Sequence, residues 1–147
     1  MKIGSQIISC TYDNTVDASA ITDAVLKANT EANGYAAVTI VPGGTTDNVT
    51  GTPVPKVKLA VASGELIYGA LMTLNTATQR CGVATGGIIP FKRSGGTSAD
   101  TDIGVGIAGA AGGAVVAAGA GQGRGVIVAR NGGVVLVDLD VNANETA

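Results

Sequence analysis

The chain has 147 residues and not one histidine. This absence excludes the Ser-His-Asp triad, the Cys-His nucleophile pair and histidine metal sites, and it removes the commonest general base. The two cysteines have no CxxC spacing, so they do not indicate a zinc site. The sequence therefore predicts a protein that is not an enzyme, with no catalytic residue, no cofactor and no metal.

Aromatic and charged side chains are also scarce. Only 3% of the residues are aromatic, with one Phe and no Trp, and 14% are charged, for a net charge of −2. A nucleic-acid interface needs a basic stripe, often with aromatic rings that stack on bases, whereas the basic residues here are scattered. The composition argues against nucleic acid as a partner. With 46% hydrophobic residues, it also argues against charge-driven disorder.

A membrane partner is not expected either. Residues 1–10 contain one basic residue but too short an apolar run for a targeting segment. Residues 103–123 carry no charge and are long enough to cross a bilayer. Glycine is frequent there, however, and each glycine costs a helix about 1 kcal/mol.

Small residues are abundant where histidine, aromatic and charged residues are scarce, and glycine alone occupies 23 positions. A core made mostly of Val and Ala buries little apolar area, and each Å² buried contributes only about 25 cal/mol. We therefore expect the fold to gain stability by associating with partners.

The N-terminal third carries the helix signal of the chain. We expect a strand up to Asp13, a helix over residues 17–32 and a strand over residues 35–41. The helix signal combines an N-cap, an apolar spacing and a glycine C-cap: Asp17 or Thr15, Ile21, Ala24, Val25, Ala28 and Gly34. Residues 43–55 are rich in Thr, Gly, Pro and Asn, which predicts an exposed loop or flexible arm.

From residue 54 onward, short apolar segments alternate with glycine-rich turns. Besides a polar loop at residues 94–101, we expect strands at residues 57–62, 66–74, 80–85, 103–108 and 114–118. The last two strands, residues 126–130 and 134–141, flank Asn131-Gly132-Gly133, whose residues tolerate the positive φ of a hairpin turn. The predicted fold is mainly β, a small β-barrel or β-sandwich of short strands with one helix in the N-terminal third.

These signals divide the chain into three parts. Residues 1–52 are expected to form an N-terminal arm with one strand, one helix and a flexible loop. Residues 53–141 form a β-rich domain, and residues 142–147 form a polar tail. A truncation before Gly34 is therefore expected to leave the β-rich domain foldable.

Two glycine-rich motifs have both a chemical and a structural interpretation. Residues 104–109 match GxGxxG, but the glycines at 112 and 113 break the helix that a dinucleotide site needs, so a strand is favoured. Residues 121–125 either hold an anion with backbone amides and Arg124 or form a plain turn, which is favoured.

Paired acidic residues and cysteines leave further alternatives open. The pairs Asp100/Asp102 and Asp138/Asp140 each form either a solvated face, which is favoured, or part of a cation site. Cys10 and Cys81 lie far apart in the sequence and form either a disulfide or two buried free thiols, which are favoured.

The order of segments between residues 58 and 140 carries a family resemblance. The segments are Glu65-Leu-Ile-Tyr-Gly-Ala-Leu-Met-Thr-Leu74, Cys81-Gly-Val-Ala-Thr85, Ile103-Gly-Val-Gly-Ile-Ala108, Gly112-Gly-Ala-Val-Val116 and Asn131-Gly-Gly-Val-Val-Leu-Val137. This order resembles the small β-barrels of tailed-bacteriophage capsid decoration proteins, also called head-stabilising or cement proteins. The helix-bearing segment before Pro53 has no counterpart in the resemblance.

The resemblance implies a structural virion protein that binds the outside of an assembled capsid and stabilises it. Its partner would be the major capsid protein lattice, and the protein would act as a homotrimer. It would be made in the host cytoplasm and reside on the outer surface of the capsid. The expected contacts are the N-terminal segment and residues 43–55, with the C-terminal tail as the competing candidate. The alternative function is a surface-exposed adhesion or head-fibre module that binds a host glycan or receptor.

Overall fold

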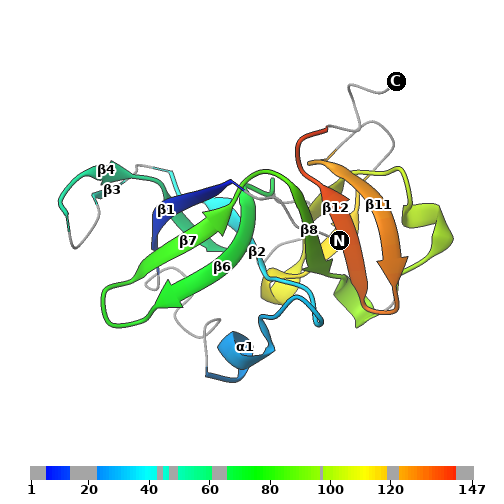
Figure 1. Cartoon of the computed structure of the whole chain (residues 1–147), viewed down its shortest axis with the longest axis horizontal. Coiled ribbons are helices and arrows are strands. Elements are labelled where there is room, and N and C mark those ends of the chain that lie inside the picture. Colours follow the sequence, from blue (N-terminus) through cyan, green and yellow to red (C-terminus); the bar gives the residue numbers. More distant parts are fainter. Residues whose placement is uncertain are drawn as a thin grey trace.

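The computed structural model describes residues 6–13, 23–42, 45–46, 50–60, 66–96, 98–118 and 123–141. The chain is mainly β, with 51% strand and 9% helix, which confirms the predicted fold class. Figure 1 shows two β units beside each other, a closed barrel and a three-stranded sheet, with a short helix below the barrel.

The barrel consists of five short strands that close into a ring. Their order around the ring is β1 (Ile7–Tyr12), β5 (Lys56–Leu59), β2 (Ala37–Ile40), β6 (Gly69–Asn75) and β7 (Arg80–Ala84). β1 runs parallel to β5, and every other neighbouring pair is antiparallel, including the β7–β1 pair that completes the ring. Closure removes the unpaired edges that an open sheet exposes.

Alternating burial explains why these segments form strands. In β5, Val57 and Leu59 are buried inside the barrel, whereas Lys56 and Lys58 are half-buried. This period of two is the pattern that predicted a strand here, and the next two expected strands correspond to β6 and β7.

The second β unit is an antiparallel sheet in the order β11 (Val126–Asn131), β12 (Val134–Asp138) and β8 (Ile88–Lys92). The predicted hairpin is confirmed, because Asn131 pairs with Val134 and Gly132 has a φ of 59°. β8 was not predicted, since Pro90 lies at its centre and proline cannot donate to a strand ladder. The Pro90 carbonyl accepts a hydrogen bond from the Tyr35 N–H at 2.9 Å.

Two smaller ribbons complete the strands. β9 (Ile107–Gly109) pairs with β10 (Val115–Ala117), and β3 (Thr45–Thr46) pairs with β4 (Pro53–Val54). The strand expected at residues 103–108 is wrong in position, because only its last two residues belong to β9. Gly104 adopts a φ of 88°, which an extended strand does not allow.

The helix ends earlier than predicted, because α1 spans Asp23–Ala28 and residues 29–32 are not helical. Residues 14–22, which include the expected N-caps Asp17 and Thr15, lie outside the described residues. The chain after α1 is tied to the barrel by Asn29, which donates to the Leu71 carbonyl and accepts from the Ala36 N–H, both at 2.7 Å. Helix and barrel are therefore joined by specific hydrogen bonds.

Two buried clusters form the hydrophobic interior. The first fills the barrel and contains Cys10, Tyr12, Ala36, Val38, Val57, Leu59, Leu71, Cys81 and Val83. The second lies between the two β units: Ala37, Ala70 and Ala84 come from barrel strands, and Phe91, Ile127 and Val137 come from the sheet. Barrel strands contribute to both clusters. The second cluster therefore packs the three-stranded sheet against the barrel.

The strand pairing crosses the domain boundary that we expected at residue 52. β1 and β2 precede this boundary, yet β1 pairs with β5 and β7, and β2 pairs with β5 and β6. Both β1 and β2 of the N-terminal segment therefore belong to the barrel, and among the described residues the β3–β4 ribbon is the arm-like part. The expected tail at residues 142–147 lies outside the described residues. Within the described part, no helix has the length and apolar character needed to span a bilayer.

Deleting residues 1–33 removes β1 and α1. We now expect the truncated protein to lose the cooperative thermal transition of the full chain, since β5 and β7 would each expose an edge and the barrel interior would open to water. Circular dichroism melting and amide NMR spectra measure this loss. A truncated protein with a cooperative melt and dispersed amide signals would contradict the role of β1 in the barrel.

Candidate interaction surface

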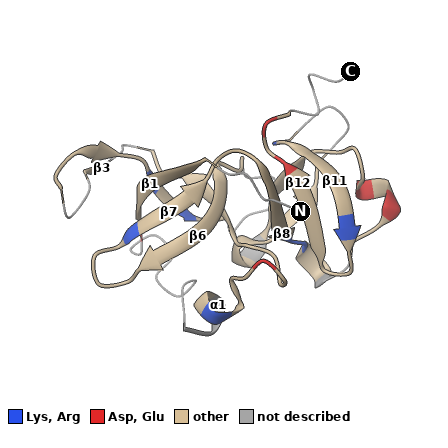
Figure 2. Ribbon diagram, in the orientation of Figure 1, with Lys and Arg blue, Asp and Glu red and all other residues tan. Residues whose placement is uncertain are grey.

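Among the described residues, charged positions are spread over the barrel, α1 and the three-stranded sheet with its loops (Figure 2). The part of the chain that the structure describes brings no three His, Cys, Asp or Glu side chains together as a metal ion would require. Its buried side-chain nitrogen and oxygen atoms all have hydrogen-bond partners. Four surfaces remain as candidates: the loop after β8, the projecting β3–β4 arm, a shallow hollow on β1, β7 and β6, and the surroundings of Arg124.

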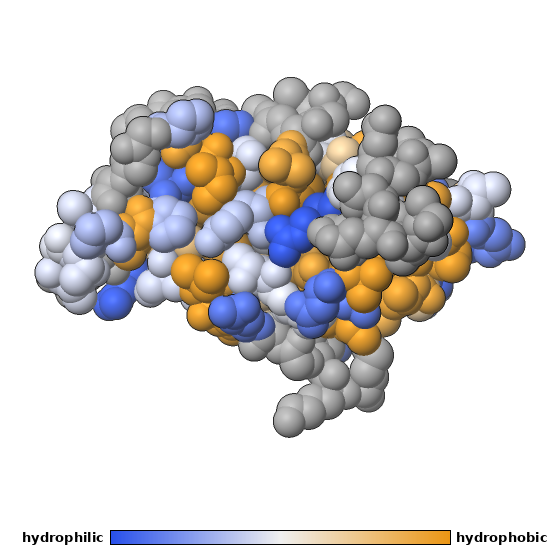
Figure 3. All heavy atoms as spheres, turned by 90° about the horizontal axis from the view of Figure 1, so that it is seen from above, coloured by the Kyte–Doolittle hydropathy of each residue, from blue (hydrophilic) through white to orange (hydrophobic). Residues whose placement is uncertain are grey.

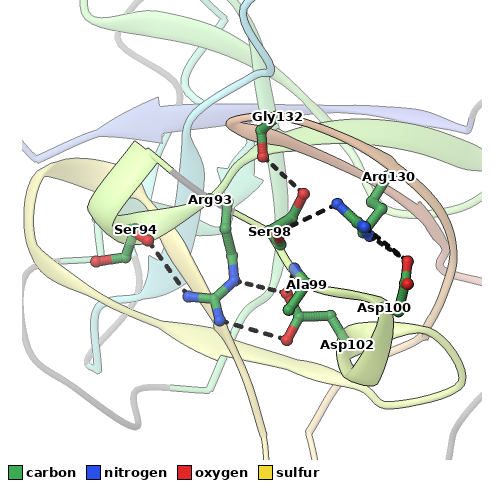
Figure 4. Close-up of polar contacts among 8 residues, drawn as sticks. All are labelled: Arg93, Ser94, Ser98, Ala99, Asp100, Asp102, Arg130 and Gly132. Atoms are coloured by element: carbon green, nitrogen blue, oxygen red, sulfur yellow. Dashed lines mark hydrogen bonds and ion pairs between the residues drawn. The ribbon is translucent and has the colours of Figure 1, made fainter.

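The loop that follows β8 folds onto the turn between β11 and β12 (Figure 4). The backbone N–H and the hydroxyl of Ser98 both donate to the Gly132 carbonyl, at 2.7 and 2.6 Å. The backbone N–H of Arg93 donates to the neighbouring Gly133 carbonyl at 2.8 Å. These bonds fix the loop against the end of the three-stranded sheet.

Arg93 and Asp102 form an ion pair beneath this loop (Figure 4). Nε of Arg93 donates to Oδ2 of Asp102 at 3.1 Å, and Nη2 donates to Oδ1 at 3.4 Å. The Ala99 N–H also donates to Oδ2, at 3.0 Å. Asp102 is only 4% exposed, yet the hydrogen bond from Arg93 lowers the pKa of its carboxyl because it stabilises the charged form.

Asp100 makes a different contact. Arg130 donates to Oδ1 of Asp100 from Nη2 at 2.6 Å and from Nε at 2.9 Å, and the side chain of Asp100 is 93% exposed. Water screens such a pair, so it contributes little to stability. The buried carboxylate of Asp102 and the exposed carboxylate of Asp100 therefore bind different arginines, and they do not converge on a common point.

The aspartates at the end of β12 accept hydrogen bonds from the backbone. Asp138 Oδ1 accepts from the Asp140 N–H at 3.0 Å, and Asp140 Oδ2 accepts from the Gly87 N–H at 3.1 Å. Asp140 thereby joins the end of β12 to the turn between β7 and β8.

Cys10 and Cys81 lie directly opposite each other in the β1–β7 pair. Both are buried free thiols, the state that the sequence favoured. Burial raises the pKa of the Cys10 thiol to about 11 and that of the Cys81 thiol to about 12. Both thiols are therefore protonated and poor nucleophiles at neutral pH.

Arg124 joins the two β units. Its backbone N–H donates to the Ile107 carbonyl at 2.9 Å, so this amide does not face an anion. Its guanidinium donates to three barrel carbonyls, those of Ile67 at 3.4 Å, Tyr68 at 2.9 Å and Thr85 at 2.7 Å. The segment that we considered as an anion cradle thus supplies a structural arginine, although residues 119–122 lie outside the described residues.

The GxGxxG segment at residues 104–109 does not open a helix. It ends in β9, and the chain then forms a short 3-10 turn at Ala111–Gly113, where Gly112 has a φ of 71°. A phosphate-binding turn needs the N-terminus of a helix at this point. The strand interpretation is therefore confirmed for residues 107–109.

The arm is the β3–β4 ribbon, which projects from the barrel beside β1 (Figure 1). The Thr11 N–H donates to the Pro55 carbonyl at 3.0 Å, and the Thr11 hydroxyl lies 3.5 Å from the Thr46 carbonyl. Residues 50–53 are exposed. The described part of the arm is thus anchored at its base and accessible along its length.

A shallow hollow of about 660 Å³ lies on the outer face of β1, β7 and β6. Ser9, Gly82 and Thr73 form one row across these strands, and Asn75 and Ile7 line its ends. A glycine inside a strand leaves room for a ligand or another backbone to approach. At Gly82 the side chains of Thr73 and Ile7 come close to the backbone, since a Cβ there would lie 2.9 Å from the Thr73 hydroxyl oxygen and 3.1 Å from Ile7.

Comparison with protein-family models, with curated proteins and with solved structures finds no match for this chain. Function must therefore be argued from the surfaces themselves.

Sequence reasoning did not single out Arg93 or Arg130 as partners of the paired aspartates. The signal was present, because Arg93 lies just before the polar loop and both aspartates lie at its end. A buried carboxylate in a loop needs a cation or several N–H donors. Which of the two aspartates is buried depends on how the loop folds onto the hairpin, and no local pattern encodes that contact.

Replacing Asp102 by Asn is expected to lower the free energy of unfolding by about 2 kcal/mol at neutral pH, because Arg93 keeps its charge without the carboxylate. The folded-state pKa of Asp102 is lowered, so its contribution is present above the ordinary carboxyl pKa and is lost as the pH falls below it. Urea unfolding measured at about pH 7 and about pH 3 tests both expectations. The difference between wild type and variant should shrink at the lower pH.

Asp100→Asn is the matched control. Its carboxylate is exposed, so the urea midpoint should stay near that of the wild type. Equal losses in the two variants would contradict the structural role assigned to the buried pair.

Proposed function

We propose that this chain is a capsid decoration protein, a structural virion protein that binds the outside of an assembled tailed-phage capsid and stabilises it. The observation that carries the proposal is the accessible β3–β4 arm, anchored at its base on a closed barrel. A rigid body with an attached arm can bind between neighbouring subunits of a shell. Because it binds the assembled lattice and not the loose subunit, its binding energy becomes shell stability.

The distribution of apolar surface supports a protein that meets partners at several points. Five large side chains that are at least 42% exposed belong to different elements and loops: Ile7, Ile40, Leu66, Ile103 and Val128. Figure 3 shows apolar patches separated by polar surface on the face seen from above. Several small patches fit a lattice contact better than one large one, since each contributes modestly and together they fix the orientation.

The proposed assembly is a homotrimer on the outer surface of the virion, with the major capsid protein lattice as its partner. The buried core supports this proposal, because Phe91 and Tyr12 are the largest fully buried side chains and most of the rest are Val, Ala, Leu and Ile. Cyclic symmetry lets one weak contact surface act three times on the same lattice.

A second candidate is the adhesion or head-fibre module, and the hollow around Gly82 favours it. Ser9, Thr73 and Asn75 present hydroxyl and amide groups there, which suit hydrogen bonds with a sugar. The decoration proposal ranks first because the arm has no role in a glycan-binding barrel. Binding to phage heads separates the two candidates.

Replacing residues 43–54 by a short Gly-Ser linker is expected to weaken binding to expanded, empty phage heads by tenfold or more. The barrel should remain intact, because β2 and β5 are antiparallel neighbours and a tight turn can join them. Co-sedimentation with heads measures binding, and the melting temperature serves as the control for folding. An armless protein that decorates heads at full occupancy would overturn the role of the arm.

The oligomeric state is tested by light scattering and by imaging of decorated heads. We expect three copies per bound unit, in solution or on the shell, because a core of small side chains leaves stability to be gained from subunit contacts. A well-folded 14.3 kDa monomer in solution, together with single copies on the shell, would contradict the trimer.

A further inference from the structure

A groove of about 350 Å³ lies where the chain between β5 and β6 meets β2 and Arg124. It is lined by Thr39, Ile40, Leu66, Ile67, Tyr68 and Arg124. The side chains of Leu66 and Ile40 are 75% and 43% exposed, so two large aliphatic groups stand at the surface. Exposed apolar groups beside a concavity are typical of a surface that another molecule covers.

Among the described residues, no carboxylate neutralises the charge of Arg124 in this groove. Its described partners are three backbone carbonyls, and no acidic side chain in the described part of the chain pairs with it. Three of the five guanidinium N–H groups point to these carbonyls, which leaves two for another acceptor. A cation beside apolar surface attracts an anion more strongly than one in open water, because the surroundings are less polarisable.

The position of Arg124 is built into the fold. Gly125 has a φ of 65°, and a side chain on it would lie 2.7 Å from the Asp138 carbonyl oxygen. The backbone of Arg124 is paired with that of Ile107, and its guanidinium is held by Tyr68 and Thr85. The guanidinium is therefore presented to the groove in one place and loses little freedom when an anion binds.

We propose that this groove binds a segment of the capsid protein that presents a carboxylate next to an aliphatic side chain, an inference that rests on the proposed function. The carboxylate binds the free N–H groups of Arg124, and the aliphatic group packs between Ile40 and Leu66. A protein segment fits better than a free small molecule. Ligand pockets cover most of the surface of a small molecule, whereas this groove leaves Leu66 largely exposed. Ile40 also ends β2, from which the chain leads to β3 of the arm.

Two isoleucines provide a matched pair of variants. Ile40 and Ile103 are 43% and 42% exposed, but only Ile40 lines the groove. Ile40→Ser and Arg124→Lys are each expected to weaken binding to expanded, empty heads, the first by about tenfold and the second by less, since lysine keeps the charge but not the fork of donors. Ile103→Ser should weaken binding much less than Ile40→Ser, because Ile103 lies outside the groove in one of the small patches that each contribute modestly. If the wild type binds heads and the Ile40→Ser variant binds them with the same affinity, the groove assignment is overturned. The proposed function would then still stand.

A second measurement tests the groove without heads. The blocked peptide acetyl-Leu-Glu-Leu-amide is titrated into the full-length isotope-labelled protein, with acetyl-Leu-Gln-Leu-amide as the control. We expect amide shifts at Ile40, Leu66 and Tyr68, with the glutamate peptide binding at least about threefold more tightly and Ile40→Ser weakening both peptides. Equal binding of the two peptides, or no shifts at these residues, would overturn the proposed groove chemistry. Specific peptide binding by a protein that leaves heads undecorated would support the groove and refute capsid decoration.

Discussion

The pairing of β1 with β7 is the contact on which the rest of the structure depends. It joins the first described strand of the chain to the last strand of the barrel and turns an open sheet into a ring. Once the ring is closed, Tyr12 and Cys10 lie among the Val and Leu side chains of the interior. The hydroxyl of Tyr12 then accepts a hydrogen bond from the Leu59 N–H at 3.3 Å, so the one large polar tip in this core has a partner.

Arginine side chains fix the loops that connect the strands of this glycine-rich chain. Glycine-rich segments gain little from packing and lose much conformational entropy on folding. Arg93 and Arg124 each reach from one element to carboxylate or carbonyl groups of another. Each guanidinium offers several donors in a fixed plane, so a single residue can order a loop that has few apolar contacts.

The parts of the fold that could be predicted from the sequence are those that a local pattern of residues determines. The alternation in β5 and the Asn131-Gly132-Gly133 turn both identify their strands, because a period of two and a positive φ are local properties. The barrel partners of β1 were not predictable, since a parallel contact between Thr11 and Lys56 leaves no mark in either segment. β8 was missed for the opposite reason. Pro90 is a local signal against a strand, but the pairing of β8 with the distant β12 overrides that signal.

The same division applies to the candidate surfaces. The exposed arm was predictable from its Thr, Gly and Pro content, since such a segment cannot bury a core of its own. The groove was not predictable, because Ile40 and Leu66 resemble core residues in the sequence. Their exposure follows only from the register of β2, in which Val38 faces the interior and Ile40 lies beyond the start of β6.

The closure of the barrel by its first strand has a consequence for synthesis. β1 leaves the ribosome before β5 and β7, its two neighbours, which follow only after long intervening segments. The three-stranded sheet is delayed further, because β8 pairs with β12, the last of the described strands. Non-local pairings of this kind fold slowly, and strands that wait for their partners expose unpaired edges. The nascent chain therefore remains open to wrong pairing until β12 has been translated, and a high concentration of nascent chains makes that interval the hazardous one.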